Sequence, residues 1–485
     1  MKKIKTLSFI LLFCIFTIVS KRNVTNYNID RSTASVCNDL ESRLEHKFNI
    51  YKKAQGKLID IILKDNSYIS RSNWEQLLES SDNCNISATD IAELKDQHKK
   101  AIEEARKKAA ENSVINLSDI KKDKNVSEFC AALPKGGVQH LHPSGVLDVE
   151  TLNELGVSRR ELSRFFIPDG KTNFQTFDRV FSPLRGLLGS GLTNNLKYGI
   201  SKYLERARKQ GVIYVEFGKL FDANSNVELT LNQWAKEFYD KYDIVVKWKV
   251  GFIRVHGGRT SRRRANSLIE AEYKYRKSSG FTHFSNIVGV DLYGNENGYG
   301  ALETSQALYI PLYAMKNSLH PKGWTSKLFT TMHSGEFGDK RNPRDAMIMG
   351  VDRIGHGVAL KDRIVDLEFA RRYNDGQGLP IEVNLVSNYR LNSIDKYKNH
   401  PFLDFLRLGL PISFNTDDEG IFKTTINDEC EMAIKHTDIQ YSELKAISYN
   451  SIHHSFIHDE KLKSDLVEKL DNMFLNFESE WVSKD

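Results

Sequence analysis

Downstream of residue 134 the chain alternates short apolar runs with longer amphipathic stretches, a pattern typical of repeated strand and helix units. Most of the intervals between the runs are long enough for a helix. Eight such runs can be counted, at residues 137–142, 212–217, 244–254, 286–292, 328–333, 353–356, 380–385 and 411–415. Because eight parallel strands close a TIM barrel, we predict an α/β fold with a (β/α)8 barrel over residues 128–485.

The region before the barrel, residues 21–127, has a different texture. From about residue 33 it is rich in Lys, Glu, Ala and Leu, and residues 91–110 form a highly charged stretch with helical periodicity. Thr89 or Asp90 is placed to cap this helix. We expect a helical extension that packs on the barrel or on a partner subunit; the alternative is a solvated surface helix.

The first twenty residues predict export. Lys2, Lys3 and Lys5 precede a largely apolar run over residues 7–19, which is shorter than the roughly 20 residues of a membrane-spanning helix. We therefore expect residues 1–20 to be a signal peptide and the protein to be secreted or periplasmic, without membrane contact after cleavage. Since no A-x-A cleavage site follows, an uncleaved membrane anchor is the alternative.

Composition and charge exclude some classes of protein. With 40% hydrophobic and 27% charged residues in a chain of 485, the sequence is typical of a globular protein with a sizeable core, and disorder is disfavoured. The net charge of +6 is spread along the chain. The densest basic cluster, residues 259–264, is interpreted as a solvated loop rather than a phosphate or nucleic-acid contact. We predict no nucleic-acid partner.

Cysteine spacing gives no zinc-thiolate motif, because no C-x-x-C pair occurs among Cys37, Cys84, Cys130 and Cys430. In an oxidising compartment Cys37 and Cys84, which both precede the barrel, are candidates for a disulfide. Two buried free thiols are the alternative.

Several of the predicted strands end in residues that can bind a metal or move a proton. The first ends in His140-Leu141-His142, and residues i and i+2 of a strand point the same way. The other such ends are His333-Ser334-Gly335-Glu336, Arg353-Ile354-Gly355-His356-Gly357 and Asn415-Thr416-Asp417-Asp418. Each alone is more typical of a structural histidine or a helix cap. Together, at the ends where TIM barrels place their active sites, they predict one catalytic site.

Three imidazoles and one carboxylate suit a borderline-soft divalent ion such as zinc. An open position for water would make the site catalytic, because zinc lowers the pKa of bound water to roughly 7. The remaining groups, Glu336, His356 and Asp418, are then available to move protons and hold the substrate.

These motifs resemble those of the adenosine deaminase family of amidohydrolase-type barrels. The resemblance covers most of the chain and rests on Leu133-Pro134-Lys135, His140-Leu141-His142, Val290-Asp291-Leu292-Tyr293-Gly294, His333-Ser334-Gly335-Glu336, Arg353-Ile354-Gly355-His356-Gly357, Ser387-Asn388 and Asn415-Thr416-Asp417-Asp418. The export signal and helical extension are similar to those of the extracellular growth-factor branch. In that branch the extension supports dimerisation, so the resemblance implies a homodimer.

The resemblance also implies a division of labour among the residues. One zinc ion per chain would be held by His140, His142, His333 and Asp417. Glu336 would give a proton to purine N1, and His356 would position and deprotonate the attacking water. Asp418 would hydrogen-bond N7, and the backbone N–H of Gly294 would contact N3. Water would then add to C6 and ammonia would leave.

Two departures from the family pattern limit what the resemblance implies. After the His-x-His pair the family usually has Leu-Asp-Gly, whose Asp contacts the ribose 5′-hydroxyl, whereas this chain has Ser144 at that position. A neutral Ser144 removes a carboxylate that would repel a 5′-phosphate. Glu419 replaces a usual Pro and Ser334 a common Ala, and neither changes a catalytic group.

The sequence therefore predicts hydrolytic deamination of adenosine or 2′-deoxyadenosine to inosine and ammonia. The first alternative is a deaminase of another 6-aminopurine, such as AMP, adenine or a 5′-modified adenosine. The second is an exported signalling or binding protein on the same barrel.

Overall fold

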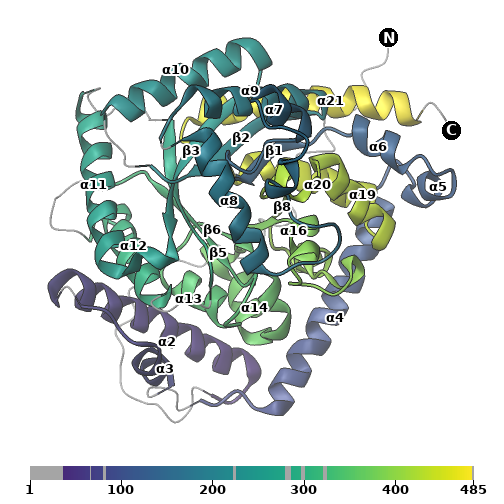
Figure 1. Ribbon diagram of the computed structural model, residues 1–485. Coiled ribbons are helices and arrows are strands. Elements are labelled where there is room, and N and C mark those ends of the chain that lie inside the picture. The colour runs from purple at the N-terminus through teal and green to yellow at the C-terminus, as the bar shows by residue number, and fades with distance from the viewer. Residues whose placement is uncertain are drawn as a thin grey trace.

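The computed structural model describes residues 37–65, 67–79, 84–189, 191–221, 225–278, 286–296, 301–319 and 325–482. At its centre, eight parallel strands follow one another in chain order around a barrel (Figure 1). They are β1 (Gly136–Leu141), β2 (Val212–Lys219), β3 (Val245–Ile253), β4 (Ile287–Tyr293), β5 (Phe329–Ser334), β6 (Arg353–His356), β7 (Ile381–Val383) and β8 (Ile412–Phe414). The predicted TIM barrel is thus confirmed, and every predicted run overlaps a strand.

Successive side chains of a strand point alternately toward the surrounding helices and into the barrel, as a closed barrel requires. Phe217 and Trp248 contact aromatic side chains of the surrounding helices, with ring centroids 5.8 Å from Tyr203 and 6.3 Å from Trp234. Their strand neighbours Glu216 and Lys249 are charged and fully buried. Charged groups of this kind form a network inside the barrel, where Arg353 donates hydrogen bonds to both Glu216 and Glu382.

The barrel closes between β1 and β8 through a short seam. Leu141 forms a parallel bridge with Asp417. Below it, the side-chain oxygen of Asn415 accepts hydrogen bonds from the backbone N–H groups of Gln139 (2.6 Å) and His140 (3.0 Å). The amide of Asn415 therefore replaces backbone pairing at the seam, which satisfies donors that burial would otherwise leave unpaired.

Within the described residues, helices surround the barrel, and five short helical turns lie among the elements of the fold. The helices are α7 (Val149–Glu154), α8 (Phe174–Leu188), α9 (Asn194–Lys209), α10 (Ser225–Tyr242), α11 (Gly257–Ser278), α12 (Ala301–Lys316), α13 (Asn342–Ile348), α14 (Ile364–Arg371), α15 (Tyr373–Gly376), α16 (Leu385–Arg390), α17 (Phe402–Arg407), α18 (Glu419–Phe422), α19 (Ile426–His436), α20 (Tyr441–His453) and α21 (Glu460–Val482). The turns are η1 (Ile61–Asp65), η2 (Leu162–Arg164), η3 (Arg254–His256), η4 (Val358–Asp362) and η5 (Tyr397–Asn399).

The N-terminal region is helical, as predicted, and packs on the barrel of its own chain. Figure 1 shows α2 beside α12 and α13, and α4 running along the flank of the barrel. Gln55 of α2 donates to the carbonyl of Ile348 (2.7 Å), and His98 of α4 lies 2.8 Å from a carboxylate oxygen of Glu368. The helices are α2 (Leu40–Asp60), α3 (Arg71–Glu79), α4 (Ala88–Glu111), α5 (Leu117–Lys122) and α6 (Val126–Ala132).

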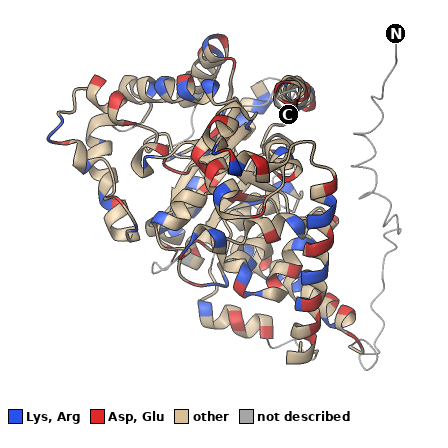
Figure 2. Ribbon diagram, turned by 90° about the vertical axis from the view of Figure 1, so that its right-hand side faces the viewer, with Lys and Arg blue, Asp and Glu red and all other residues tan. Residues whose placement is uncertain are grey.

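Two local predictions were wrong. The N-cap of α4 is Ser87, not Thr89 or Asp90; Asp90 instead accepts the backbone N–H of Ser87 at 2.8 Å and completes a capping box. The basic cluster at residues 259–264 lies in α11 rather than in a loop. Within it Arg262 and Arg264 donate to backbone carbonyls of neighbouring segments. Figure 2 shows Lys and Arg interspersed with Asp and Glu over the ribbon.

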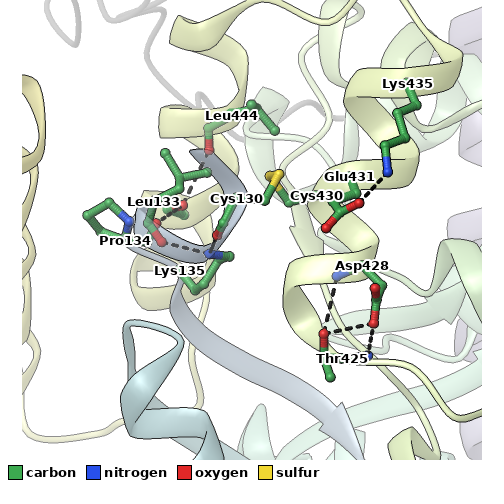
Figure 3. Close-up of a disulfide and its surroundings, with 11 residues drawn as sticks. Cys130, Leu133, Pro134, Lys135, Thr425, Asp428, Cys430, Glu431, Lys435 and Leu444 are labelled. Atoms are coloured by element: carbon green, nitrogen blue, oxygen red, sulfur yellow. Dashed lines mark hydrogen bonds and ion pairs between the residues drawn. A yellow bond between two sulfur atoms is a disulfide. The ribbon is translucent and has the colours of Figure 1, made fainter. Parts of the chain in front are cut away.

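Two disulfides link the described residues. One joins Cys37 to Cys84, which decides between the two states that the sequence left open. The other, which was not predicted, joins Cys130 of α6 to Cys430 of α19 across 300 positions (Figure 3).

The predicted signal peptide lies outside the described residues. Among the helices within them, none is long and apolar enough to cross a membrane.

Candidate metal centre and active site

Four predicted metal ligands meet at one mouth of the barrel. His140 lies near the end of β1, and His142 follows this strand. His333 lies in β5, and Asp417 follows β8. Their ligand atoms all lie within 4.8 Å of one another. Nε2 of His140 and Nε2 of His142 are each 3.3 Å from Oδ1 of Asp417, and the Nε2 atoms of His142 and His333 are 3.2 Å apart.

These donors fit a divalent cation. Two imidazole nitrogens that face each other at 3.2 Å need a proton or a cation between them, because both can otherwise present lone pairs. Nε2 of His140 is buried and makes no hydrogen bond to the described residues. Three imidazoles and one carboxylate are a donor set typical of catalytic zinc.

Carboxylates behind the imidazoles orient them toward the same point. Nδ1 of His140 is 2.7 Å from Oε2 of Glu382, and Nδ1 of His333 is 3.1 Å from Oδ1 of Asp291. Pairing of a ligand histidine with a carboxylate selects the tautomer that leaves Nε2 free for the metal. Asp417 is held in turn by the hydroxyl of Ser387, which donates to Oδ2 at 2.8 Å.

The backbone is strained at two of the site residues. His356 has φ 67° and Asp417 φ 59°, in the left-handed region that costs a residue other than glycine about 1–3 kcal/mol. Both residues stand at the end of a strand, and the unusual φ turns their side chains into the mouth. Strain of this kind persists where surrounding contacts hold the residue in place. Here Oδ2 of Asp417 accepts a hydrogen bond from Ser387, and Nδ1 of His356 is hydrogen-bonded to the side-chain amide of Asn388.

The predicted proton-transfer groups lie beside the metal ligands. Nε2 of His356 is 3.5 Å from Oε2 of Glu336. Burial, with the charge of Asp417 next in importance, raises the pKa of Glu336 well above its usual value. Burial also raises the pKa of Asp418 to about 8 and lowers that of His356 well below its usual range. These shifts favour the protonated acid at Glu336 and the neutral imidazole at His356.

Glycine is required where Asp418 enters the site. A Cβ atom on Gly145 would lie 1.7 Å from Oδ1 of Asp418, so only glycine fits there. The predicted ribose-side residue, Ser144, precedes it in the half-buried turn after β1. The predicted N3 contact, Gly294, follows β4 with φ 94°, which favours glycine. The contacts of Ser144 and Gly294 with a substrate remain predictions.

A family model described as adenosine deaminase matches residues 140–473, which is most of the chain and includes every candidate ligand. The chain belongs to the adenosine deaminase family. A growth-factor-like branch within that family remains an expectation.

Individual relatives align over different shares of their length. An adenosine deaminase of Clostridium botulinum strain 657 is 26% identical over 303 residues, covering 62% of this chain and 80% of that protein. Another, from strain Langeland, is 33% identical over 134 residues, covering 27% of this chain. The match with this second relative spans only 39% of its length.

Two solved structures share the fold of this family member. The N6-mAMP deaminase of Arabidopsis has a TM-score of 0.56 and 21% identity, covering 71% of this chain and 99% of that one. An amidohydrolase of Burkholderia ambifaria, solved with bound Zn, has a TM-score of 0.56 and 20% identity, covering 73% and 94%. At such identities the likeness shows the fold.

Sequence reasoning missed several buried carboxylates of this family member. Glu296 accepts the backbone N–H groups of Gly335 (2.8 Å), Glu336 (2.9 Å) and Phe337 (3.3 Å), so it holds the turn that carries Glu336. Glu382 and Asp291 orient ligand histidines, as described above. Asp291 lies inside the family motif at residues 290–294. No sequence feature distinguishes Glu296 or Glu382 from surface glutamates, because their partners are distant in the chain.

Proposed function

We propose that this protein is a zinc-dependent deaminase that converts adenosine or 2′-deoxyadenosine to inosine and ammonia. The observation that carries the proposal is the convergence of four metal ligands beside Glu336 and His356, whose pKa shifts favour the protonated acid and the neutral imidazole. Membership of the adenosine deaminase family and the zinc of the B. ambifaria amidohydrolase support it. When bound, such an ion supplies a Lewis acid that makes hydroxide available near neutral pH.

The residues of the chain then divide the remaining work. Glu336, protonated because it is buried among acidic groups, donates a proton to N1 of the purine. Asp418, whose pKa is raised to about 8, is largely protonated at pH 7 and can donate to N7, which is an acceptor. His356 holds the attacking oxygen beside C6, and the backbone N–H of Gly294 donates to N3. Addition at C6 and loss of the amino group complete the reaction.

A panel of purines tests this assignment. We would load the protein with zinc, verify the stoichiometry by metal analysis, and follow loss of the 6-amino absorbance with adenosine, 2′-deoxyadenosine, adenine and AMP. The highest kcat/KM is expected with adenosine or 2′-deoxyadenosine. A rate with AMP far above that with adenosine would reject the first choice.

The alternative substrate is a 6-aminopurine with a modified 5′ end. Ser144 favours it, because this position carries no charge that would repel a phosphate. A fold neighbour named for N6-mAMP is consistent with it. Ser144→Asp separates the two: it should leave adenosine turnover within about threefold yet suppress turnover of AMP if AMP is a substrate.

We also propose that the protein is exported. Two disulfides support this, because such bonds form and persist in oxidising compartments.

The growth-factor-like branch and a homodimer remain proposals of the same kind. Light scattering of the purified protein tests the dimer, and a cell effect that survives Glu336→Gln would favour a signalling role.

A further inference from the structure

A chain of hydrogen bonds runs from α17 to the side of His356 that faces away from the metal ligands. It passes from the backbone of Phe402, the first residue of α17, through His400 and Asn388 to His356. The side chains of His400, Asn388 and His356 are 5%, 0% and 0% exposed. Each of these groups therefore depends on its protein partner rather than on solvent.

The first bond sets the direction of the others. The backbone N–H of Phe402 lies 3.1 Å from Nδ1 of His400, and an N–H group can only donate. Since this N–H belongs to the first turn of a helix, the helix itself offers it no acceptor. Nδ1 of His400 is therefore an acceptor. Burial lowers the pKa of His400 to about 3, so the ring is neutral and carries its single hydrogen on Nε2.

The second and third bonds follow from the first. Nε2 of His400 lies 3.0 Å from Oδ1 of Asn388, so the ring donates and the amide oxygen accepts. This settles the orientation of the Asn388 amide, whose Nδ2 lies 2.8 Å from Nδ1 of His356. Nδ2 of Asn384 lies 3.4 Å from the same atom. With amide donors on both sides, Nδ1 of His356 accepts and carries no hydrogen.

We propose that His400 and Asn388 are positioning residues that hold His356 in the tautomer with hydrogen on Nε2, so that His356 presents a donor to the reacting atoms. Nε2 is buried, lies 3.5 Å from Oε2 of Glu336 and has no hydrogen-bond partner among the described residues. It is thus a buried N–H aimed into the site. The proposal deepens the proposed function and rests on it for its effect on rate.

This tautomer changes the role implied by family resemblance. A neutral His356 with hydrogen on Nε2 cannot take a proton from water at that atom. It instead donates a hydrogen bond to the attacking oxygen and stabilises the charge that develops there. Proton transfer then falls to Glu336. It gives its proton to N1, takes one from the attacking water, passes that proton to the leaving amino group, and recovers a proton from the C6 hydroxyl as the carbonyl forms.

Nitrogen NMR tests the tautomer directly. We would label histidine with 15N in the zinc-loaded protein without substrate and assign His356 by its disappearance in His356→Gln. The expected spectrum shows an unprotonated Nδ1 and a protonated Nε2 for this residue. A protonated Nδ1 in the unchanged chain would overturn the proposal.

Asn388→Asp tests the control that the amide exerts. A carboxylate at this position accepts rather than donates, so the hydrogen of His356 is expected to move to Nδ1. The kcat should fall by about 10²-fold, as when an oxyanion donor is lost, with KM within about threefold and one zinc per chain retained. An unchanged tautomer in a folded Asn388→Asp variant would contradict the proposal.

His400→Leu tests the distal end, and His98→Leu is its matched control. His98 is also buried, at 4% exposure, and hydrogen-bonds Glu368 away from the site. His400→Leu frees the Asn388 amide to turn over, so mixed tautomers of His356 and a kcat lowered at least tenfold are expected. His98→Leu should change neither. Equal kcat values and a single His356 tautomer in both variants would overturn the proposal. If the wild-type protein shows the expected His356 tautomer but no deaminase activity, only the proposed function is rejected.

Discussion

The backbone N–H of Asp417 donates to the carbonyl oxygen of His140 over 3.2 Å. The N–H of His142 returns a bond of 3.1 Å to the carbonyl of Asp417. These backbone bonds help to close the barrel between β1 and β8, together with those to the Asn415 side chain, and all three residues are candidate metal ligands. Closure of the barrel therefore also brings together three of the four candidate metal ligands.

Metal removal is expected to abolish turnover and to lower the temperature of thermal unfolding. A ligand that binds only the folded state stabilises it by about 2.7 kcal/mol at a hundredfold excess over Kd. The measurement is a thermal melt and a deaminase assay before chelation, after it, and after zinc is restored. Full activity in protein shown by metal analysis to be metal-free would exclude a catalytic metal.

Glu336→Gln is expected to lower kcat by about 10²–10⁴-fold, because the amide has the shape of the acid but cannot supply its proton. Metal content and the unfolding temperature should stay close to those of the unchanged protein. Steady-state kinetics with adenosine and metal analysis on one sample check this. A variant that keeps more than about half of kcat would remove Glu336 from proton transfer.

Glu296→Gln is expected to lower kcat at least tenfold with little change in KM. The new amide group would face N–H donors at Gly335, Glu336 and Phe337 and displace the turn that holds Glu336. Glu272→Gln is the matched control: Glu272 is also buried and accepts a backbone N–H, that of Lys327 at 2.7 Å, before β5 rather than after it. Equal losses of kcat in both variants would indicate general destabilisation instead.

Thiol counting under denaturing, non-reducing conditions is expected to find no free thiol among Cys37, Cys84, Cys130 and Cys430. Replacing Cys130 and Cys430 together by Ala should lower the free energy of unfolding by about 2–4 kcal/mol, since the bond closes a long loop. Chemical denaturation measures the loss. Four free thiols in the native protein would contradict both disulfides.

Protonation of the Glu368 carboxylate should contribute to unfolding of the protein by acid. Burial opposes its charge, but the hydrogen bond with His98 and the charge of Arg371 outweigh burial and lower its pKa to about 2. Since the unfolded value is near 4.3, the carboxylate stabilises the fold above about pH 5, and this contribution is lost as pH falls toward 2. The difference in unfolding temperature between wild type and Glu368→Gln should therefore be largest near pH 7 and shrink toward pH 2. A difference independent of pH would contradict this.

Local patterns predicted much of the framework. The eight apolar runs became eight strands because a strand buried on both faces is largely apolar, and this is visible in a short window. The four candidate ligands were found because they follow these runs. The N-cap of α4 was predicted less well. The side chains of Ser87 and Asp90 each accept the backbone N–H of the other residue, and Thr89 carries a similar hydroxyl group two positions after Ser87.

The sequence by itself determined the order of strands and helices, the family, and which imidazoles and carboxylates stand at strand ends, because each depends on residues close together in the chain. Only the tertiary structure decided which buried carboxylates support the site, that Cys130 meets Cys430, and how His400 acts on His356 through Asn388. Hydrogen-bond direction and the pairing of buried charges depend on distances across the barrel. The separation of two residues along the chain does not indicate those distances.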